Sequence, residues 1–326
     1  MDVLDEIVAR LPGSRRLGLD AARPLIVAVG ADEAALDVEP RLSLSYDIAP
    51  CLRLRAAVAP LDGLELEVSP SERRLRVDGD GLDAPLRVRL DDGAHVALTE
   101  ARRGLGVADL VAASNDGTLA QALLDDVARA ALVDALELRI QLGLWGRRAV
   151  VGGGRLRVAD GEVGFEWEGG VDLDRLAPAA FAVAAIATAP DRLTRRCARV
   201  AEALDGHLTG DRWQLGDGFA IRVVRGGVPM ELDHVRTLAH EPASAARLRT
   251  RLRAPRDWGG DGAAAGRAAA AVKAAGLARV PTLWTSPDHL TLLWDGLIDD
   301  TAELVPALDL MRRLATPGAA PVGPYR

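Results

Sequence analysis

The stretch LTLLWDGLIDDTAELVPA, residues 290–307, repeats an earlier stretch, VGFEWEGGVDLDRLAPA, residues 163–179. After one inserted residue the match continues to an Ala-Thr pair that closes each copy, at 187–188 and at 315–316. The most specific matches are Trp167 with Trp294, Gly169 with Gly296, Asp172 with Asp299, and Pro178 with Pro306. Self-similarity within one chain indicates a structural unit that is used twice. We therefore predict two related halves.

Each copy has the pattern of a strand, a turn and a helix. Tryptophan ends an apolar strand, glycine makes the turn, and aspartate caps or precedes the helix. Pro178 and Pro306 are expected in the first turns of their helices, where a missing N–H costs little. Because each of these roles is structural, we interpret the repeat as a folding module and not as a functional motif.

The chain has 326 residues, enough for two domains of ordinary size. Apolar residues make up 49% and charged residues 27%, which is globular composition and argues against a disordered chain. The net charge of −7 argues against general nucleic-acid binding, which depends on a basic surface. Lys273 is the only lysine, and this bias towards arginine is typical of GC-rich bacterial coding. An arginine cluster is therefore not a binding signal by itself.

Three features bear on cellular location. Cys51 and Cys197 are the only cysteines, and no Cys-x-x-Cys occurs, so we expect a reducing cytoplasm. The N-terminal residues lack the pattern of a secretory signal. The longest uncharged apolar run, 176–190, is shorter than the roughly 20 residues that a membrane span needs. We predict that this run is a buried helix and that the chain has no membrane span.

Period-two segments bounded by Asp-Gly turns predict an antiparallel meander in the first half. The expected strands are 25–29, 42–48, 52–58, 64–68, 75–77, 86–90 and 96–98. One helix follows, with Leu119, Leu123, Leu124, Val127, Ala131 and Leu132 on one face. Four strands then precede the first repeat helix, at 138–144, 149–151, 156–158 and 163–167.

The second half is expected to repeat the order with fewer strands. The predicted strands are 213–215, 219–224, 229–232, 280–284 and 290–294. The predicted helices are 192–204, 242–252, 263–275 and a last one after Asp300, which has a capping-box spacing to Glu303. We divide the chain into an N-terminal α+β half, 1–190, a C-terminal α+β half, 191–316, and a Pro/Gly-rich tail, 317–326.

The densest group of possible metal ligands is Asp233, His234, His240 and Glu241. The two histidines are six residues apart, whereas helical metal pairs use spacings of three or four, so the group predicts no metal site. The glycines at 260–266 lack the preceding strand of a dinucleotide site, and those at 152–154 lack the residues of a phosphate loop. Cys51 and Cys197 are expected to be packing residues.

Arginines alternate with other residues over 247–253. As a strand this segment would present an arginine face, and as a helix it would present only Arg247 and Arg251 together. We favour the helix, with a solvated face as its ordinary role. A patch for acidic partners or phosphate groups is the alternative.

These observations predict an α+β fold of two related halves, each an antiparallel sheet with a long helix packed on it. No catalytic, cofactor-binding or metal-binding residue is assigned, no cofactor is expected, and the sequence resembles no known family. The favoured function is a non-catalytic protein-binding or scaffolding protein of the bacterial cytoplasm, with another protein as partner and an unassigned oligomeric state. The alternatives are a hydrolase that uses the His234/His240/Glu241 region and a small-ligand-binding protein with a pocket between the halves.

Overall fold

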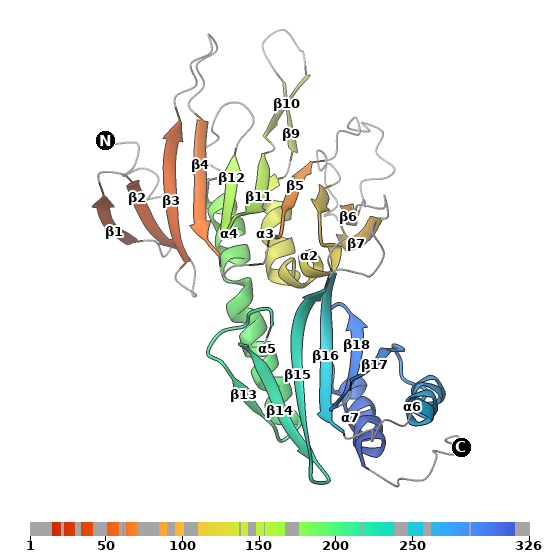
Figure 1. Cartoon of the computed structure of the whole chain (residues 1–326). Coiled ribbons are helices and arrows are strands. Elements are labelled where there is room, and N and C mark those ends of the chain that lie inside the picture. Colours follow the sequence, from red (N-terminus) through yellow and green to blue (C-terminus); the bar gives the residue numbers. More distant parts are fainter. Residues whose placement is uncertain are drawn as a thin grey trace. The chain divides into compact units, whose positions relative to one another are not determined.

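A computed structural model of the chain describes residues 15–20, 23–29, 34–41, 51–58, 61, 63–70, 85–89, 95–100, 110–136, 138–142, 148–152, 154–166, 176–216, 218–237, 247–256, 262–286 and 288–316. Helices and largely antiparallel sheets occur together, so the predicted α+β class is confirmed. The chain divides into two compact units, Met1–Ala189 and Pro190–Arg326 (Figure 1).

The first unit contains a ten-stranded sheet in the order β1-β2-β3-β4-β12-β11-β5-β8-β6-β7. Its strands are β1 Arg15–Asp20, β2 Arg23–Val29, β3 Ala34–Arg41, β4 Cys51–Ala57, β5 Leu66–Pro70, β6 Pro85–Arg89, β7 His95–Glu100, β8 Leu110–Ser114, β11 Arg155–Ala159 and β12 Glu162–Glu166. A separate two-stranded ribbon is formed by β9 Leu138–Leu142 and β10 Arg148–Gly152.

The predicted simple meander is correct only for part of this sheet. Strands β1 to β4 pair in chain order, but β12 and β11 then lie between β4 and β5, and β6 pairs with β8 in parallel. Strands β1, β3 and β8 were not predicted. The Asp160-Gly161 turn was predicted correctly: both residues have positive φ, 52° and 75°, as a primed hairpin turn requires. The expected strands at 42–48 and 75–77 lie outside the described residues.

The predicted single helix after the meander is two helices, α2 Gly117–Leu123 and α3 Asp126–Leu136. The break occurs because the Asp125 side chain accepts a hydrogen bond from the Ala128 N–H at 3.0 Å and so caps a new helix. As a result Val127, expected on the buried face, is 56% exposed.

The first repeat helix is α4, Leu176–Ala187, and most of its residues are buried, as predicted. It packs against β2, β3, β4 and β12. Pro178 is its third residue, where no intrahelical N–H bond is lost. Trp167, Gly169 and Asp172 lie outside the described residues, so the proposed equivalence of Trp167 and Trp294 stays a prediction.

The second unit contains a six-stranded sheet in the order β13-β14-β15-β16-β18-β17, with every pair antiparallel. Its strands are β13 His207–Thr209, β14 Ala220–Arg225, β15 Val228–Thr237, β16 Arg247–Pro255, β17 Thr282–Thr285 and β18 His289–Asp295. Its helices are α5 Ala189–Ala203, α6 Gly262–Ala274 and α7 Thr301–Ala315. Helix α7 packs against β14, β15 and β16.

The second repeat helix carries the buried stripe that its sequence predicts. Leu304, Leu308, Met311 and Ala315 are all buried. Asp300 is the N-cap and accepts from the Ala302 N–H at 2.9 Å. The expected capping box is incomplete, because the Glu303 side chain pairs with Arg279 at 2.7 Å. Pro306 lies inside the helix and not in its first turn, contrary to prediction.

Two further predictions for this unit are wrong. Residues 213–215 form no strand, although Trp213 is buried, and β13 was not predicted. The segment expected as a helix over 242–252 contains strand β16, which begins at Arg247. The tail, 317–326, lies outside the described residues.

Membrane-spanning capacity was assessed for the described helices. None of them alone has the length and apolar character to cross a membrane, whereas α4 and α5, consecutive and bent at their junction, meet the criterion as a pair by length and composition.

Candidate interaction surface

Strand β16 carries four arginines on one face of the C-terminal sheet. Leu248, Thr250, Leu252 and Ala254 are buried on the other face, and the intervening arginines are half-buried or exposed. In the strand, each arginine lies opposite a residue of β15. In a helix, Arg247 and Arg251 would instead lie side by side, one turn apart. Like charges four residues apart destabilise a helix.

We name this side of the sheet the arginine face. Cross-strand register places Glu231 opposite Arg253 and Asp233 opposite Arg251, with Arg222 opposite Glu231 on its other side. Further along β15 and β16, Thr237 lies opposite Arg247. The residues of the arginine face used below are Arg222, Glu231, Asp233, Thr237, Arg247, Arg249, Arg251, Arg253 and Asp295.

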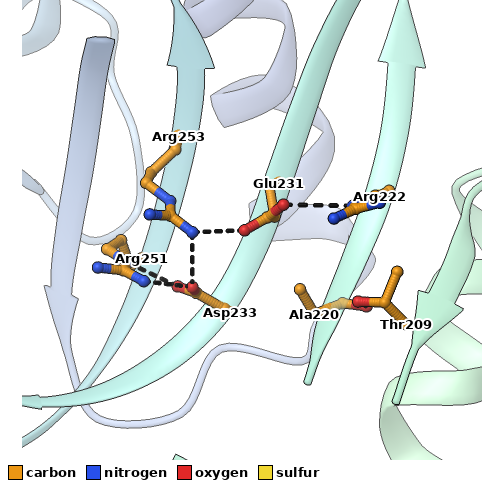
Figure 2. Close-up of polar contacts among 7 residues, drawn as sticks. All are labelled: Thr209, Ala220, Arg222, Glu231, Asp233, Arg251 and Arg253. Carbon is orange, nitrogen blue, oxygen red and sulfur yellow. Dashed lines mark hydrogen bonds and ion pairs between the residues drawn. The ribbon is translucent and has the colours of Figure 1, made fainter. Parts of the chain in front are cut away.

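The central ladder consists of Arg222, Glu231, Arg253, Asp233 and Arg251, and it crosses β14, β15 and β16 (Figure 2). Arg251 donates from Nε to Asp233 Oδ1 at 2.8 Å and from Nη2 to Oδ2 at 2.5 Å. Arg253 donates to both carboxylates, and Arg222 Nε donates to Glu231 Oε2 at 3.3 Å. Two parallel bonds between a guanidinium and a carboxylate fix direction as well as charge.

Asp233 is the buried centre of this ladder. Its side chain is fully buried, whereas those of Arg251 and Arg253 stay partly exposed. Burial raises the pKa of the Asp233 carboxyl, and the hydrogen bond and charges of the two arginines oppose that rise. The ladder therefore holds its guanidinium groups in fixed positions at the surface.

The strand-end cluster consists of Thr237, Arg247, Arg249 and Asp295. Asp295 lies 3.0 Å from Arg249 Nε and 3.6 Å from Arg247 Nη1. The Arg249 Nε–Asp295 contact is an ion pair without hydrogen-bond geometry, so this buried Nε has no hydrogen-bond partner among the described residues. The buried Thr237 Oγ1 likewise has no hydrogen-bond partner among the described residues.

The backbone at Gly296 positions Asp295. Gly296 donates to the Leu248 carbonyl at 2.8 Å and accepts from the Thr250 N–H at 3.1 Å. Its φ of +81° lets the chain leave β18 at this point, which confirms the predicted turn. Asp295 lies between Trp294 and Gly296, within the repeated stretch 290–307.

Among the described residues, arginines outnumber carboxylates in both parts of the arginine face. The central ladder has three arginines and two carboxylates, and the strand-end cluster has two arginines and one carboxylate. Among the described residues, the strand-end cluster thus carries one unit of positive charge more than its carboxylate neutralises. This contrasts with the net charge of −7 of the whole chain.

His234 lies in β15 on the opposite, buried face of the sheet, and its residue exposure is 2%. Trp213 Nε1 donates to His234 Nδ1 at 3.2 Å. Burial lowers the pKa of His234 to about 4, and the charge of Asp299 opposes that shift. The structure thus separates His234 from the surface, while His240 and Glu241 lie outside the described residues.

The two cysteines lie in a helix and in a strand. Cys197 is buried in α5, as predicted, and burial raises the pKa of its thiol to about 12, so it stays protonated. Cys51 is the first residue of β4. Across the described ranges, no His, Cys, Asp and Glu side chains gather in a group that could hold a metal.

Small hollows lie among the described residues of both units. One of about 80 Å³ lies on the N-terminal sheet and is lined by Glu67, Arg155, Arg157, Gly164 and Glu166. One of about 180 Å³ is lined by Arg196, Arg199, Val200, Asp299 and Thr301. Each is smaller than the roughly 300 Å³ at which ordinary ligand pockets begin.

Sequence reasoning did not identify Glu231, Asp233 or Asp295 as partners of the arginines. The signal for them was the strict alternation over 247–253, which is typical of a strand. A strand with alternating arginines pairs favourably with a strand that has alternating acidic residues. The segment Glu231-Leu232-Asp233 has that pattern.

Comparison of the chain with protein-family models, with curated proteins and with solved structures finds no match. Its function is therefore inferred from the arginine face itself.

Proposed function

We propose that the chain is a non-catalytic binding protein of the bacterial cytoplasm that recognises an acidic segment of another protein at the arginine face. The observation that carries the proposal is the excess of guanidinium groups over carboxylates among the described residues of the strand-end cluster, where Arg247 and Arg249 share Asp295. Complementary charge steers association and fixes the register of a partner more than it adds affinity.

The chemistry of arginine supports a protein partner with carboxylates. A guanidinium presents a planar fork of donors that matches a carboxylate, and it is less strongly hydrated than a lysine ammonium. Strand pairing and the buried Asp233 hold these forks in place before binding. Less side-chain entropy is then lost on association.

The hydrolase alternative has less support. A catalytic base must come within hydrogen-bond reach of its substrate. The His234 ring is buried and its Nδ1 already accepts a hydrogen bond from Trp213.

The duplication hypothesis remains part of the proposal. Both copies of the repeat supply a strand followed by a helix, β12 with α4 and β18 with α7. In both units that helix packs against the sheet. This shared order supports a common origin of the two halves.

Selection from a random peptide library tests the proposed function. The full-length protein is immobilised, and bound peptides are sequenced after washing at low and at moderate salt. We expect enrichment of Asp- and Glu-rich peptides, with weaker binding as salt screens the contacts. A variant that combines Arg247→Gln with Arg249→Gln should lose this enrichment. Enrichment of basic or purely apolar peptides would contradict the proposal.

A further inference from the structure

The strand-end cluster combines unmet hydrogen bonds with unbalanced charge. Arg249 Nε and Thr237 Oγ1 are buried without a hydrogen-bond partner among the described residues. Buried donors in folded proteins are nearly always bonded, so each exception needs an explanation. Thr237 and Arg249 lie on the same face of adjacent strands as diagonal neighbours, because Thr237 pairs with Arg247 and Arg249 pairs with Val235, two pair positions along. A single acceptor placed there could serve both.

The missing acceptor is expected to be negatively charged. Among the described residues, Asp295 is the carboxylate that pairs with both Arg247 and Arg249, and its own side chain is 52% exposed. One added carboxylate would balance the charge of the cluster, because two guanidinium groups would then face two carboxylates. A phosphate dianion would instead leave surplus negative charge beside Asp295.

We infer that the strand-end cluster binds a carboxylate group, supplied by an Asp or Glu side chain of the partner. This inference rests on the proposed function for the source of that group. The carboxylate first meets Arg247, whose side chain is 44% exposed. The Arg247 side chain moves away from Thr237, its cross-strand neighbour. The two carboxylate oxygens then accept hydrogen bonds from the guanidinium groups of Arg247 and Arg249 and from the Thr237 hydroxyl.

The central ladder provides a matched control within the same face. Arg222 is also exposed and also pairs with a carboxylate, Glu231. It has no unsatisfied buried nitrogen, unlike Arg249. Loss of Arg222 thus removes one charge from the arginine face without touching the strand-end cluster.

The test uses N-acetyl-glutamate methylamide as a probe and its glutamine analogue as the neutral control, at matched ionic strength. Binding to the full chain is followed by NMR through the arginine Nε–H signals, with the Arg249 signal identified from Arg249→Gln. The glutamate probe should shift that signal saturably, and the glutamine probe should not. Thr237→Val should weaken binding roughly threefold to tenfold, and Arg249→Gln at least about tenfold. Arg222→Gln should stay within about twofold.

Several results would overturn the inference. Equal losses for Arg222→Gln and Arg249→Gln, with no effect of Thr237→Val, would mean diffuse charge attraction. Tighter binding of inorganic phosphate than of the glutamate probe would mean a different ligand class. If acidic peptides are selected but the glutamate probe does not shift Arg249, the proposed function stands and this site fails. If the probe binds but no acidic peptide is selected, the carboxylate site stands and the proposed function fails.

Discussion

At the scale of single residues, Trp213 fixes one state of His234. The indole N–H donates to Nδ1, so the neutral ring carries its proton on Nε2. The ring is buried, and charging it there would require desolvating an imidazolium. His234 is therefore a packing residue that resists protonation.

This burial predicts an acid-dependent loss of stability. The folded pKa of His234, about 4, is below the ordinary 6.5, so the unfolded chain binds the proton more tightly between these values. The contribution of neutral His234 to the free energy of unfolding is fully present above pH 6.5 and is lost as the pH falls towards 4. Between pH 7 and pH 5 the free energy of unfolding should fall by about 2 kcal/mol from this residue. Urea unfolding at both pH values measures it.

His234→Gln is the control, because glutamine keeps an acceptor for Trp213 and does not titrate. The other four histidines remain in both proteins. The variant should lose about 2 kcal/mol less than the wild type between the two pH values. An equal pH dependence in both proteins would show that His234 is not held neutral.

At the scale of elements, two glycines place opposite demands on the backbone. Gly296 ends β18 with φ of +81°, and Gly266 lies exposed within helix α6. A Cβ added at either position would meet no atom within 4 Å. The two sites thus differ in backbone conformation and not in available space.

Alanine at these positions should shift stability in opposite directions. Gly296→Ala forces an L-residue into the left-handed region and should lower the free energy of unfolding by about 1–2 kcal/mol. Gly266→Ala should raise it by about 0.5–1 kcal/mol, because alanine favours the helix. Chemical denaturation of each variant and of the wild type measures both changes in the free energy of unfolding. Destabilisation by Gly266→Ala would show that α6 is not a regular helix at this position.

At the scale of the whole molecule, each compact unit has its own buried core. Leu156 in β11 is fully buried in the first unit, and Leu292 in β18 is fully buried in the second. Truncation of a fully buried leucine costs about 2–5 kcal/mol, including the cavity that it leaves.

We predict two calorimetric unfolding transitions, one for each unit. Leu156→Ala should lower one transition temperature and Leu292→Ala the other, each by roughly 10 °C. The double variant should show both shifts together, because distant sites add. A single transition that both variants lower equally would mean that the units unfold as one cooperative body.

The sequence by itself determined the local features. Asp-Gly and Gly-Gly turns, the buried apolar helix α4 and the stripe of α7 follow from residue-level preferences that do not depend on distant partners. The capping residue Asp300 was likewise visible, since a cap acts within its own helix.

The tertiary structure decided which strands pair and what the arginines do. No local signal places β12 and β11 between β4 and β5, because strand order depends on long-range pairing. Arginine residues at 247–253 are compatible with a helix in isolation, and pairing with the acidic positions of β15 makes them a strand. The arginine face and its excess charge therefore exist only after β14, β15, β16 and β18 come together, since each strand supplies only part of the charge pattern.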